Sequence, residues 1–219
     1  MHDRQSQFAR LVRGAVECRA CFTQGEVSSP FIDVAQPRSV GPKYWTSGLR
    51  VAVLMLNPGQ SRNDAGARGY LQNIHLFRKG ALSLEKILEG QRSVMAGWGR
   101  PAGRFGSFYL EGLGLRLAET AFVNVAWCAT AKNQYPATML RRCFELHTGP
   151  LLKLLAPHVV VASGSRVHDF ANQVRGLVPG SLVIETLHYA HRAGKAKEGA
   201  ELVRVKAALR KFRQTVSTG

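Results

Sequence analysis

The sequence predicts an α/β protein, a three-layer sandwich with a central, mainly parallel four-stranded sheet flanked by helices. Four short runs are rich in β-branched residues, and three of them are almost continuously apolar, as expected for strands buried on both faces of a parallel sheet. Stretches with a helical spacing of apolar residues lie between these runs. No repeat, low-complexity tract or linker is visible in the 219 residues, so we expect residues 1–219 to form a single domain.

The individual elements follow from these patterns in chain order. Strands are predicted at residues 50–56, 120–127, 158–163 and 181–187. Helices are predicted at residues 4–17, 82–90, 105–119, 136–147, 150–157, 165–176 and 199–214. Gly90 ends the second helix, and the Gly149-Pro150 pair is expected to separate the fourth helix from the fifth, because neither residue favours a helix interior.

The charge balance points to a polyanionic partner. The chain has 30 Lys and Arg against 14 Asp and Glu, a formal net charge of +16. Nucleic acid is the first candidate for such a partner, and an anionic membrane surface is the second. No stretch reaches the roughly 18 apolar residues of a membrane span. The polar start MHDRQSQ is not a signal peptide. We therefore expect a cytoplasmic monomer that does not enter a membrane.

Polar residues and glycines stand at the carboxyl ends of the four predicted strands. In an open parallel sheet, ligands bind beyond these ends, where the loops leave the sheet. We therefore expect residues from the four strand ends to converge. They are Asn57 and Gly59 after the first strand, Asn124 and Cys128 at the second, Gly164 after the third and His188 after the fourth.

The four cysteines form the sharpest motif. Cys18 and Cys21 make a C-x-x-C pair at the end of the first helix, Cys128 follows the second strand, and Cys143 lies 15 residues later. A cytoplasmic protein keeps its thiols reduced, so metal binding or simple burial are the available roles. The second spacing does not resemble a zinc knuckle, which favours a 4Fe-4S cluster over zinc. Zinc, or buried thiols with an accidental C-x-x-C, are the alternatives.

Taken together, these residues resemble the uracil-DNA glycosylase superfamily, and within it the iron–sulfur members called family four. The matching parts occur in the family's order from Cys18 to about Arg192. They are the C-x-x-C pair, a strand running into Pro-Gly, and the segments NVAWCATAKNQYPATMLRRC, PHVVVASGS and ETLHYAHR, the last near the family's Thr-Tyr-His-Pro-Ser. The spacing of Asn124 and Cys128 within the cysteine pattern is the most specific part. The resemblance implies a DNA-repair enzyme that removes uracil and holds an iron–sulfur cluster.

Two departures separate the chain from family four. The residues Leu56-Asn57-Pro58-Gly59 stand where the family has an acidic Gly-Glu-Ala-Pro-Gly, and they resemble the Asn-Pro-Gly of the mismatch-specific and single-strand-selective branches. The residues His188-Tyr189-Ala190 stand in place of His-Pro-Ser. The base specificity of family four therefore does not carry over, and other deaminated bases, deaminated purines or a mismatched pyrimidine are alternative substrates.

Catalysis of N-glycosidic hydrolysis requires a positioned water and a stabilised leaving base. Asn57 is the candidate that orients the water, because its carboxamide can accept a hydrogen bond but is too weak a base to deprotonate it. Pro58 and Gly59 would fix the loop and allow close approach of the backbone to the base. His188 is the candidate donor to the base carbonyl, since ETLH aligns with the family's Thr-Tyr-His. His191 is the alternative candidate for this donor. Asp64 is the alternative to Asn57 as the residue that orients the water.

Recognition of the flipped base calls for an amide and an aromatic ring. Asn124 can offer an acceptor and a donor to the imide edge of uracil. A structural amide that braces neighbouring loops is the alternative for Asn124. Tyr70 lies where the family has its stacking aromatic after the Pro-Gly loop, and Phe77 is the second choice.

Contacts to DNA phosphates are expected from loops around the same strand ends. Gly164 and Ser165 lie at the N-terminus of a predicted helix, which would bind an anion beside Arg166. The basic segment 188–197, with His191 and Arg192, is expected to contact DNA next to the flipped base.

The sequence therefore predicts a monomeric glycosylase that hydrolyses the N-glycosidic bond of uracil in DNA. A non-catalytic iron–sulfur module that binds DNA or RNA is the alternative from a different class.

Overall fold

The chain forms two compact units in the computed structural model, which describes residues 2–23, 35–36, 39–58, 65–98, 104–130, 134–190 and 194–217. Unit 1 comprises Met1–Arg38, Asn57–Val94 and Asn124–Leu154. Unit 2 comprises Ser39–Leu56, Met95–Val123 and Leu155–Gly219. Each unit is therefore assembled from three separate stretches of the chain.

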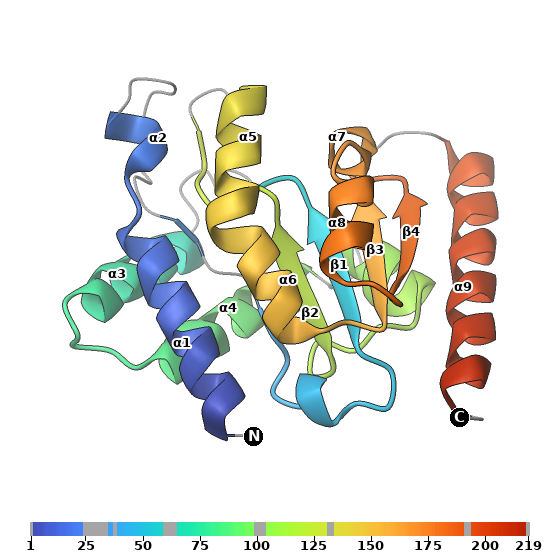
Figure 1. Ribbon diagram of the computed structural model, residues 1–219, viewed down its shortest axis with the longest axis horizontal. Coiled ribbons are helices and arrows are strands. Elements are labelled where there is room, and N and C mark those ends of the chain that lie inside the picture. Colours follow the sequence, from blue (N-terminus) through green and yellow to red (C-terminus); the bar gives the residue numbers. More distant parts are fainter. Residues whose placement is uncertain are drawn as a thin grey trace. The chain divides into compact units, whose positions relative to one another are not determined.

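A four-stranded parallel sheet is the centre of unit 2 (Figure 1). Its strands are β1 (Val51–Met55), β2 (Thr120–Asn124), β3 (Val159–Ser163) and β4 (Leu182–Thr186), in the order β2-β1-β3-β4. The register places Val51 opposite Val159 and Val159 opposite Leu182. The sheet confirms the predicted α/β class, and all four strands lie within the predicted ranges.

One face of the sheet carries the main apolar core of unit 2. Alternate strand residues point to this face, as the two-residue period of a strand requires. They pack against η2 (Gly106–Gly112), a π-helix, and against α9 (Lys195–Ser217). The core includes Val53, Val161 and Ile184 from the strands, Tyr109 from η2 and Leu209 from α9.

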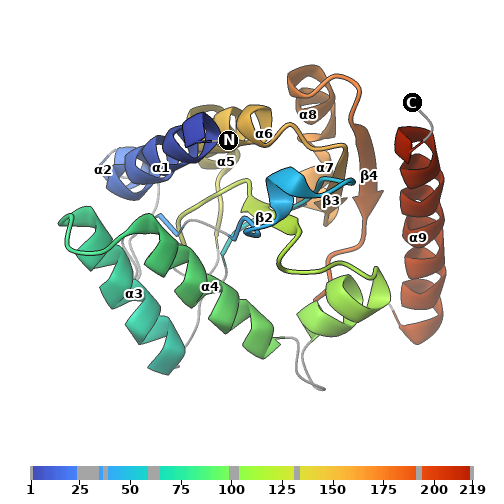
Figure 2. The same ribbon diagram turned by 90° about the horizontal axis from the view of Figure 1, so that it is seen from below.

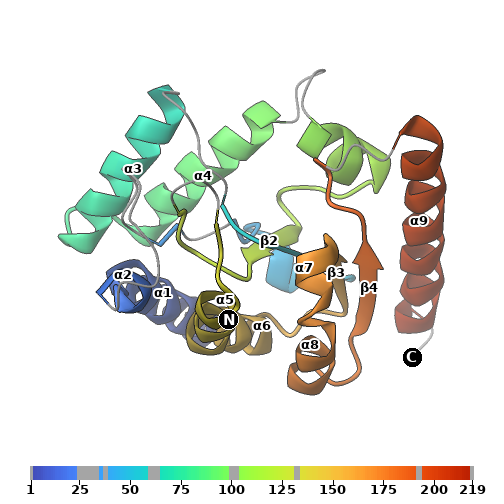
Figure 3. The ribbon, with the colours of Figure 1, turned by 90° about the horizontal axis from the view of Figure 1, so that it is seen from above.

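The opposite face of the sheet is covered by α7 (Ser165–His168) and α8 (Ala171–Leu177). Glu185 shows this directly, because it neighbours the core residue Ile184 and its carboxylate accepts a 3.1 Å hydrogen bond from Arg175 of α8. Figures 2 and 3 show α7 and α8 on one side of β3 and β4, with η2 on the other side. Helix, sheet and helix therefore form the three predicted layers.

Unit 1 is built from helices. They are α1 (His2–Glu17), α2 (Ala20–Thr23), α3 (Ala65–Arg78), α4 (Leu84–Trp98, whose last turn belongs to unit 2), α5 (Ala137–Cys143), η4 (Phe144–Thr148) and α6 (Gly149–Leu155). The guanidinium carbon of Arg13 on α1 lies 4.7 Å from the ring centre of Phe77 on α3. Across the described ranges of the chain, no helix is long and apolar enough to cross a membrane.

The helix predicted to end at Gly90 is longer than expected, because one glycine costs a helix interior only about 1 kcal/mol and α4 continues to Trp98. Two further predicted helix boundaries were wrong. The helix from Ala137 continues through Gly149-Pro150 to Leu155, with the π-helical segment η4 just before the proline. A wider π turn at this point accommodates a residue that has no N–H to donate. In the other case, the helix predicted at 105–119 ends near Leu113, because Gly114 takes a φ of 69° that reverses the chain.

The short segment η1 (Tyr44–Thr46) completes the regular elements of unit 2. Backbone hydrogen bonds tie the preceding stretch to β2, with the Ser39 carbonyl accepting from Phe122 at 2.8 Å and Gly41 donating to Thr120 at 3.1 Å. A Cβ added to Gly41 would lie 2.3 Å from the Ala118 backbone, so only glycine fits there.

Candidate functional site

The residues predicted from sequence divide between the two units. Unit 1 holds Asn57, Tyr70, Asn124 and the four cysteines, and unit 2 holds Gly164, Ser165, Arg166 and His188. Gly59, Asp64, His191 and Arg192 lie outside the described residues. The two groups have different surroundings and are built by different elements.

Asn57 is half-buried two residues after β1, and its side chain is hydrogen-bonded to Tyr135. The Tyr135 hydroxyl also donates to the Cys128 carbonyl at 3.3 Å. Burial raises the pKa of Tyr135, while the hydrogen bonds from Thr130 and Asn57 act to lower it. A carboxamide has an oxygen that can accept a hydrogen bond from a water and a nitrogen that can donate one.

Asn124 is the most unusual polar residue of unit 1. It is 1% exposed at the carboxyl end of β2, and neither Nδ2 nor Oδ1 has a hydrogen-bond partner among the described residues. Leaving a buried amide unpaired costs roughly 1–3 kcal/mol, so proteins seldom do so without a reason. An amide group of this kind is suited to a ligand that brings its own donor and acceptor.

The backbone of Asn124 is held by Thr148, the last residue of η4. Thr148 Oγ1 lies 2.6 Å from the Asn124 carbonyl oxygen and 3.2 Å from that of Val125. The same oxygen accepts a 3.0 Å hydrogen bond from the indole N–H of Trp127. The side chain of Asn124 therefore projects from a strand end whose backbone is firmly placed.

The four cysteines line one small cavity of unit 1. Cys18 directly follows α1, Cys21 lies in α2, Cys128 forms an isolated bridge with Ala35, and Cys143 ends α5. His147 also lines the cavity, and its buried Nε2 has no hydrogen-bond partner among the described residues. Burial lowers the pKa of His147, so the ring is neutral at pH 7.

The chemistry of this cavity fits an electron-deficient metal group. Burial raises the pKa values of Cys128 and Cys143, and the other thiols raise them further, so thiolates here require a positive partner. The backbone N–H of Trp127 donates to Cys143 Sγ at 3.2 Å, a contact that favours a thiolate. No group of three or more His, Cys, Asp or Glu within the described ranges is arranged for a metal ion. Four cysteine thiols around one cavity are the ligand set that a 4Fe-4S cluster uses.

The two candidate stacking aromatics both lie on α3. The side chain of Tyr70 is outside the described part of the structure. Phe77 is buried under the Arg13 guanidinium, so its ring serves the packing of α1 against α3. Phe77 is therefore not available to stack on a flipped base.

His188 follows β4 by two residues in unit 2. The N–H of Ala190 donates to His188 Nδ1 at 3.2 Å, so the neutral ring carries its proton on Nε2. The ring lies against Tyr189, with 4.4 Å between ring centres, and Tyr189 in turn contacts Phe105 and Tyr109. Nε2 is thus the nitrogen that can donate to the carbonyl of a leaving base.

The chain before His188 is held on both sides. The Leu187 carbonyl accepts a 3.1 Å hydrogen bond from Ser163, whose hydroxyl also bonds Tyr109, and the Leu187 N–H donates to Glu201 of α9 at 3.3 Å. Hydrogen bonds from Arg204 hold the pKa of Glu201 at about 2, so Glu201 is ionised at pH 7. The position of His188 therefore depends on β3, η2 and α9.

Gly164 contacts His188 directly. It has a φ of 100°, which favours glycine, and an added Cβ would lie 3.3 Å from His188 Cβ. Ser165 and Arg166 are exposed in α7, which begins directly after Gly164. Within unit 2, the structure thus brings the ends of β3 and β4 together as predicted, with Gly164 acting as packing space for the histidine.

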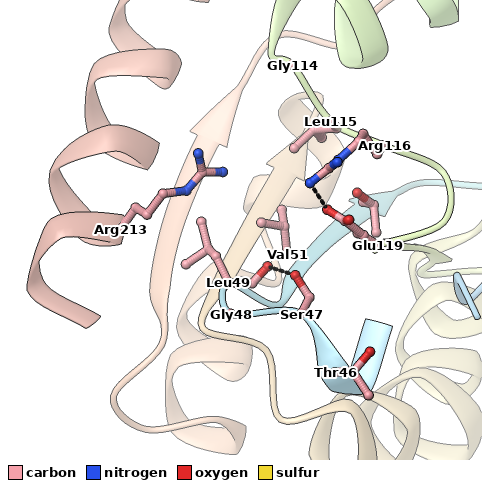
Figure 4. Close-up of a pocket in the computed structure, with 11 residues that line it drawn as sticks. Thr46, Ser47, Gly48, Leu49, Val51, Gly114, Leu115, Arg116, Glu119 and Arg213 are labelled. Carbon is pink, nitrogen blue, oxygen red and sulfur yellow. Dashed lines mark hydrogen bonds and ion pairs between the residues drawn. The ribbon is translucent and has the colours of Figure 1, made fainter. Parts of the chain in front are cut away.

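A cavity of about 730 Å³ lies at the other end of the strands in unit 2 (Figure 4). It borders Val51 and Thr120, the first residues of β1 and β2, and none of the predicted site residues lines it. Figure 4 shows the Arg116 guanidinium paired with Glu119, at 2.7 Å, which neutralises that part of the wall. The cavity is therefore not the site at which the predicted chemistry is expected.

Three residues that support the site were missed by sequence reasoning, namely Tyr135, Trp127 and Thr148. Tyr135 precedes Pro136, the N-cap residue of α5, and Thr148 lies 24 residues after the carbonyl that it bonds. Buried hydroxyl and indole groups need partners, which is a general signal that such residues brace a loop. The identity of each partner depends on folding.

The chain matches no protein-family model and no curated protein.

Proposed function

We propose that this protein is a DNA glycosylase that hydrolyses the N-glycosidic bond of uracil in DNA. The observation that supports this most is the carboxamide of Asn124, buried at a strand end with neither polar atom paired among the described residues. A flipped uracil presents an N–H donor beside a carbonyl acceptor, which is the complement of one carboxamide. The net charge of +16 suits a polyanionic substrate.

The reaction needs one water and one leaving base. The bond between C1′ of the sugar and the base nitrogen breaks, and its electron pair stays with the base. Asn57 accepts a hydrogen bond from the water through its carboxamide oxygen and points the water at C1′, while the hydrogen bond to Tyr135 steadies its side chain. The water oxygen bonds to C1′ and its proton passes to solvent, because an amide is not basic enough to keep it.

The histidine acts on the leaving base. His188 donates from Nε2 to the base carbonyl on which negative charge develops, and this stabilises the anion as the bond breaks. The Ala190 N–H on Nδ1 keeps the required proton on Nε2 in the neutral ring. A neutral donor suffices because uracil is a moderately acidic leaving group.

Cys18, Cys21, Cys128 and Cys143 are the residues that would hold a 4Fe-4S cluster. When bound, the cluster supplies a cross-link between three segments of unit 1 and takes no part in hydrolysis. Zinc is the alternative occupant. Iron, sulfide and zinc analysis of the purified protein distinguishes the two.

The test is a base-release assay on uracil-containing single-stranded and double-stranded DNA, with free uracil measured by chromatography. We expect the wild-type protein to release uracil, and Asn124→Ala to slow release by roughly a hundredfold or more, because the base edge loses its partners. Asn172→Ala is the matched control, since Asn172 is exposed on α8, where its side-chain oxygen accepts a hydrogen bond from Arg175. It should release uracil at the wild-type rate.

Other outcomes of this assay would indicate a different function. Release of hypoxanthine without uracil would identify a glycosylase for deaminated purines. Tight DNA binding without release of any base would contradict the proposal and favour a non-catalytic iron–sulfur module. Retained uracil release in Asn124→Ala would remove Asn124 from base recognition.

A further inference from the structure

A chain of buried hydrogen bonds runs from the cysteine cavity to Asn124 within unit 1. The Trp127 backbone N–H donates to Cys143 Sγ at 3.2 Å, and the Trp127 indole N–H donates to Thr148 Oγ1 at 3.0 Å. Thr148 donates to the Asn124 carbonyl at 2.6 Å. Trp127 therefore contacts a candidate metal ligand with its backbone and the support of Asn124 with its side chain.

Thr148 is placed to couple these contacts. It is fully buried, and its hydroxyl both accepts from Trp127 and donates to a carbonyl, so its bonding capacity is used on both sides. Cys143 and Thr148 are five residues apart, and the segment between them is the π-helix η4, in which residues five apart are one hydrogen-bonded turn apart. Cys143 and Thr148 are therefore linked along the helix as well as through Trp127.

Asn124 depends on this support more than an ordinary buried amide does. Its side-chain atoms have no hydrogen-bond partner among the described residues, so no side-chain bond fixes the carboxamide. Its orientation is set by the backbone, whose carbonyl is held by Thr148. A shift of Thr148 therefore changes where the carboxamide points.

We infer that the cysteine site regulates base recognition, and that Trp127 and Thr148 are the positioning residues that connect Cys143 to Asn124. When Cys143 is bound to metal, its sulfur keeps the Trp127 backbone in place, the indole holds Thr148, and Asn124 is aligned for the base. When metal is lost, Cys143 is released and Asn124 loses its alignment. The role of Asn124 in base recognition rests on the proposed function. The link between Cys143 and Asn124 can be measured separately, by hydrogen exchange.

The first arm of the test measures hydrogen exchange of the backbone amides of residues 125–128. Removal of metal from the wild-type protein should speed their exchange at least tenfold. Thr148→Val keeps the side-chain shape but removes the hydroxyl, and should speed the same exchange while metal content stays unchanged. Thr148→Ser should restore protection. Thr138→Val is the matched control on the exposed face of α5, and should exchange like wild type.

The second arm measures uracil release. Thr148→Val should lower kcat/KM about tenfold, the effect of one buried hydrogen bond, with binding to undamaged DNA unchanged. In an Asn124→Ala background, Thr148→Val should cause no further loss, because its effect passes through Asn124. Additive losses, or wild-type exchange in Thr148→Val, would overturn the inference. If the wild-type protein releases no base but exchange changes as expected, the coupling stands and the glycosylase proposal fails.

Discussion

The carboxamide residues of unit 1 and the histidine of unit 2 are held in place by different forces. Asn57 and Asn124 are braced by buried hydrogen bonds that lead to the cysteine-bearing segments, through Tyr135 and Thr148 respectively. His188 is braced by contact with Tyr189 and by a strand-end loop that is pinned to β3 and α9. Unit 1 thus depends on polar bonds near a candidate metal site, and unit 2 on a sheet and its apolar core.

Because they are held differently, the residues of unit 1 and those of unit 2 should lose their positions under different conditions. Hydrogen bonds between loops are few and specific, so the loss of one anchor releases the residues that depend on it. A parallel sheet with a packed core distributes its stability over many contacts. Perturbing the cysteines should therefore disturb Asn57 and Asn124 and leave the surroundings of His188 intact.

Cys128→Ser should have the largest effect. We expect the wild-type protein to be brown with a broad visible absorption, and the variant to lose that absorption together with uracil release. Amide protection should fall in residues 134–148 of unit 1 and persist in residues 182–190 of unit 2. Equal loss of protection in both segments would show that the two units do not differ in this way. A colourless wild-type protein with stoichiometric zinc would show that the cysteines bind zinc and not a cluster.

Asn57→Ala should have the next largest effect. It removes the carboxamide that orients the water, so uracil release should slow by roughly two to four powers of ten while DNA binding is nearly retained. Asn57→Asp should keep or raise activity, because a carboxylate can stabilise positive charge on the sugar. Single-turnover rates and a binding assay separate the two effects. If Asn57→Ala released uracil at the wild-type rate, another residue would have to orient the water, and Asp64 would be the first to test.

Gly164→Ala tests the surroundings of His188. The added Cβ would lie 3.3 Å from His188 Cβ at a φ of 100°, so the free energy of unfolding should fall by roughly 1–3 kcal/mol. Uracil release should slow while the visible absorption stays unchanged. Gly176→Ala on α8 is the matched control, because a Cβ there meets nothing within 4 Å. Loss of absorption in Gly164→Ala would contradict the independence of the two units.

Glu201 should make the stability of unit 2 depend on pH. Its pKa is lowered from 4.5 to about 2 by the Arg204 hydrogen bonds. A depressed carboxyl pKa stabilises the folded state above pH 4.5, and this contribution is lost as the pH falls towards 2. Chemical unfolding between these pH values should show the loss in wild type and less of it in Glu201→Gln. Glu89→Gln, in an exposed pair with Lys86, should retain the wild-type profile.

Arg166→Ala should have the smallest effect. Arg166 is exposed in α7, so its removal should weaken binding to all DNA sequences alike and reduce the salt slope by about 1. Binding titrations at several salt concentrations give the slope. A change in the preferred base would show that this part of unit 2 takes part in base recognition.

The α/β class and the positions of the four strands could be predicted from the amino-acid sequence. These features are local, because a run of β-branched residues identifies a buried strand without knowledge of its neighbours. The cysteine spacing likewise indicated a shared site, and the four thiols do line one cavity. Helix α3 was not predicted, since AGARGYLQNIHLFR contains two glycines and only a weak apolar stripe.

The partners that hold the candidate residues could not be predicted from the sequence. Tyr135 reaches the Cys128 carbonyl, and Thr148 bonds a carbonyl 24 residues away. Folding also assigned the proton of His188 to Nε2 and placed Phe77 under Arg13. These outcomes depend on pairs of groups that are distant in sequence, and a buried polar group takes whichever partner the folded chain brings within reach. No local pattern of residues contains that information.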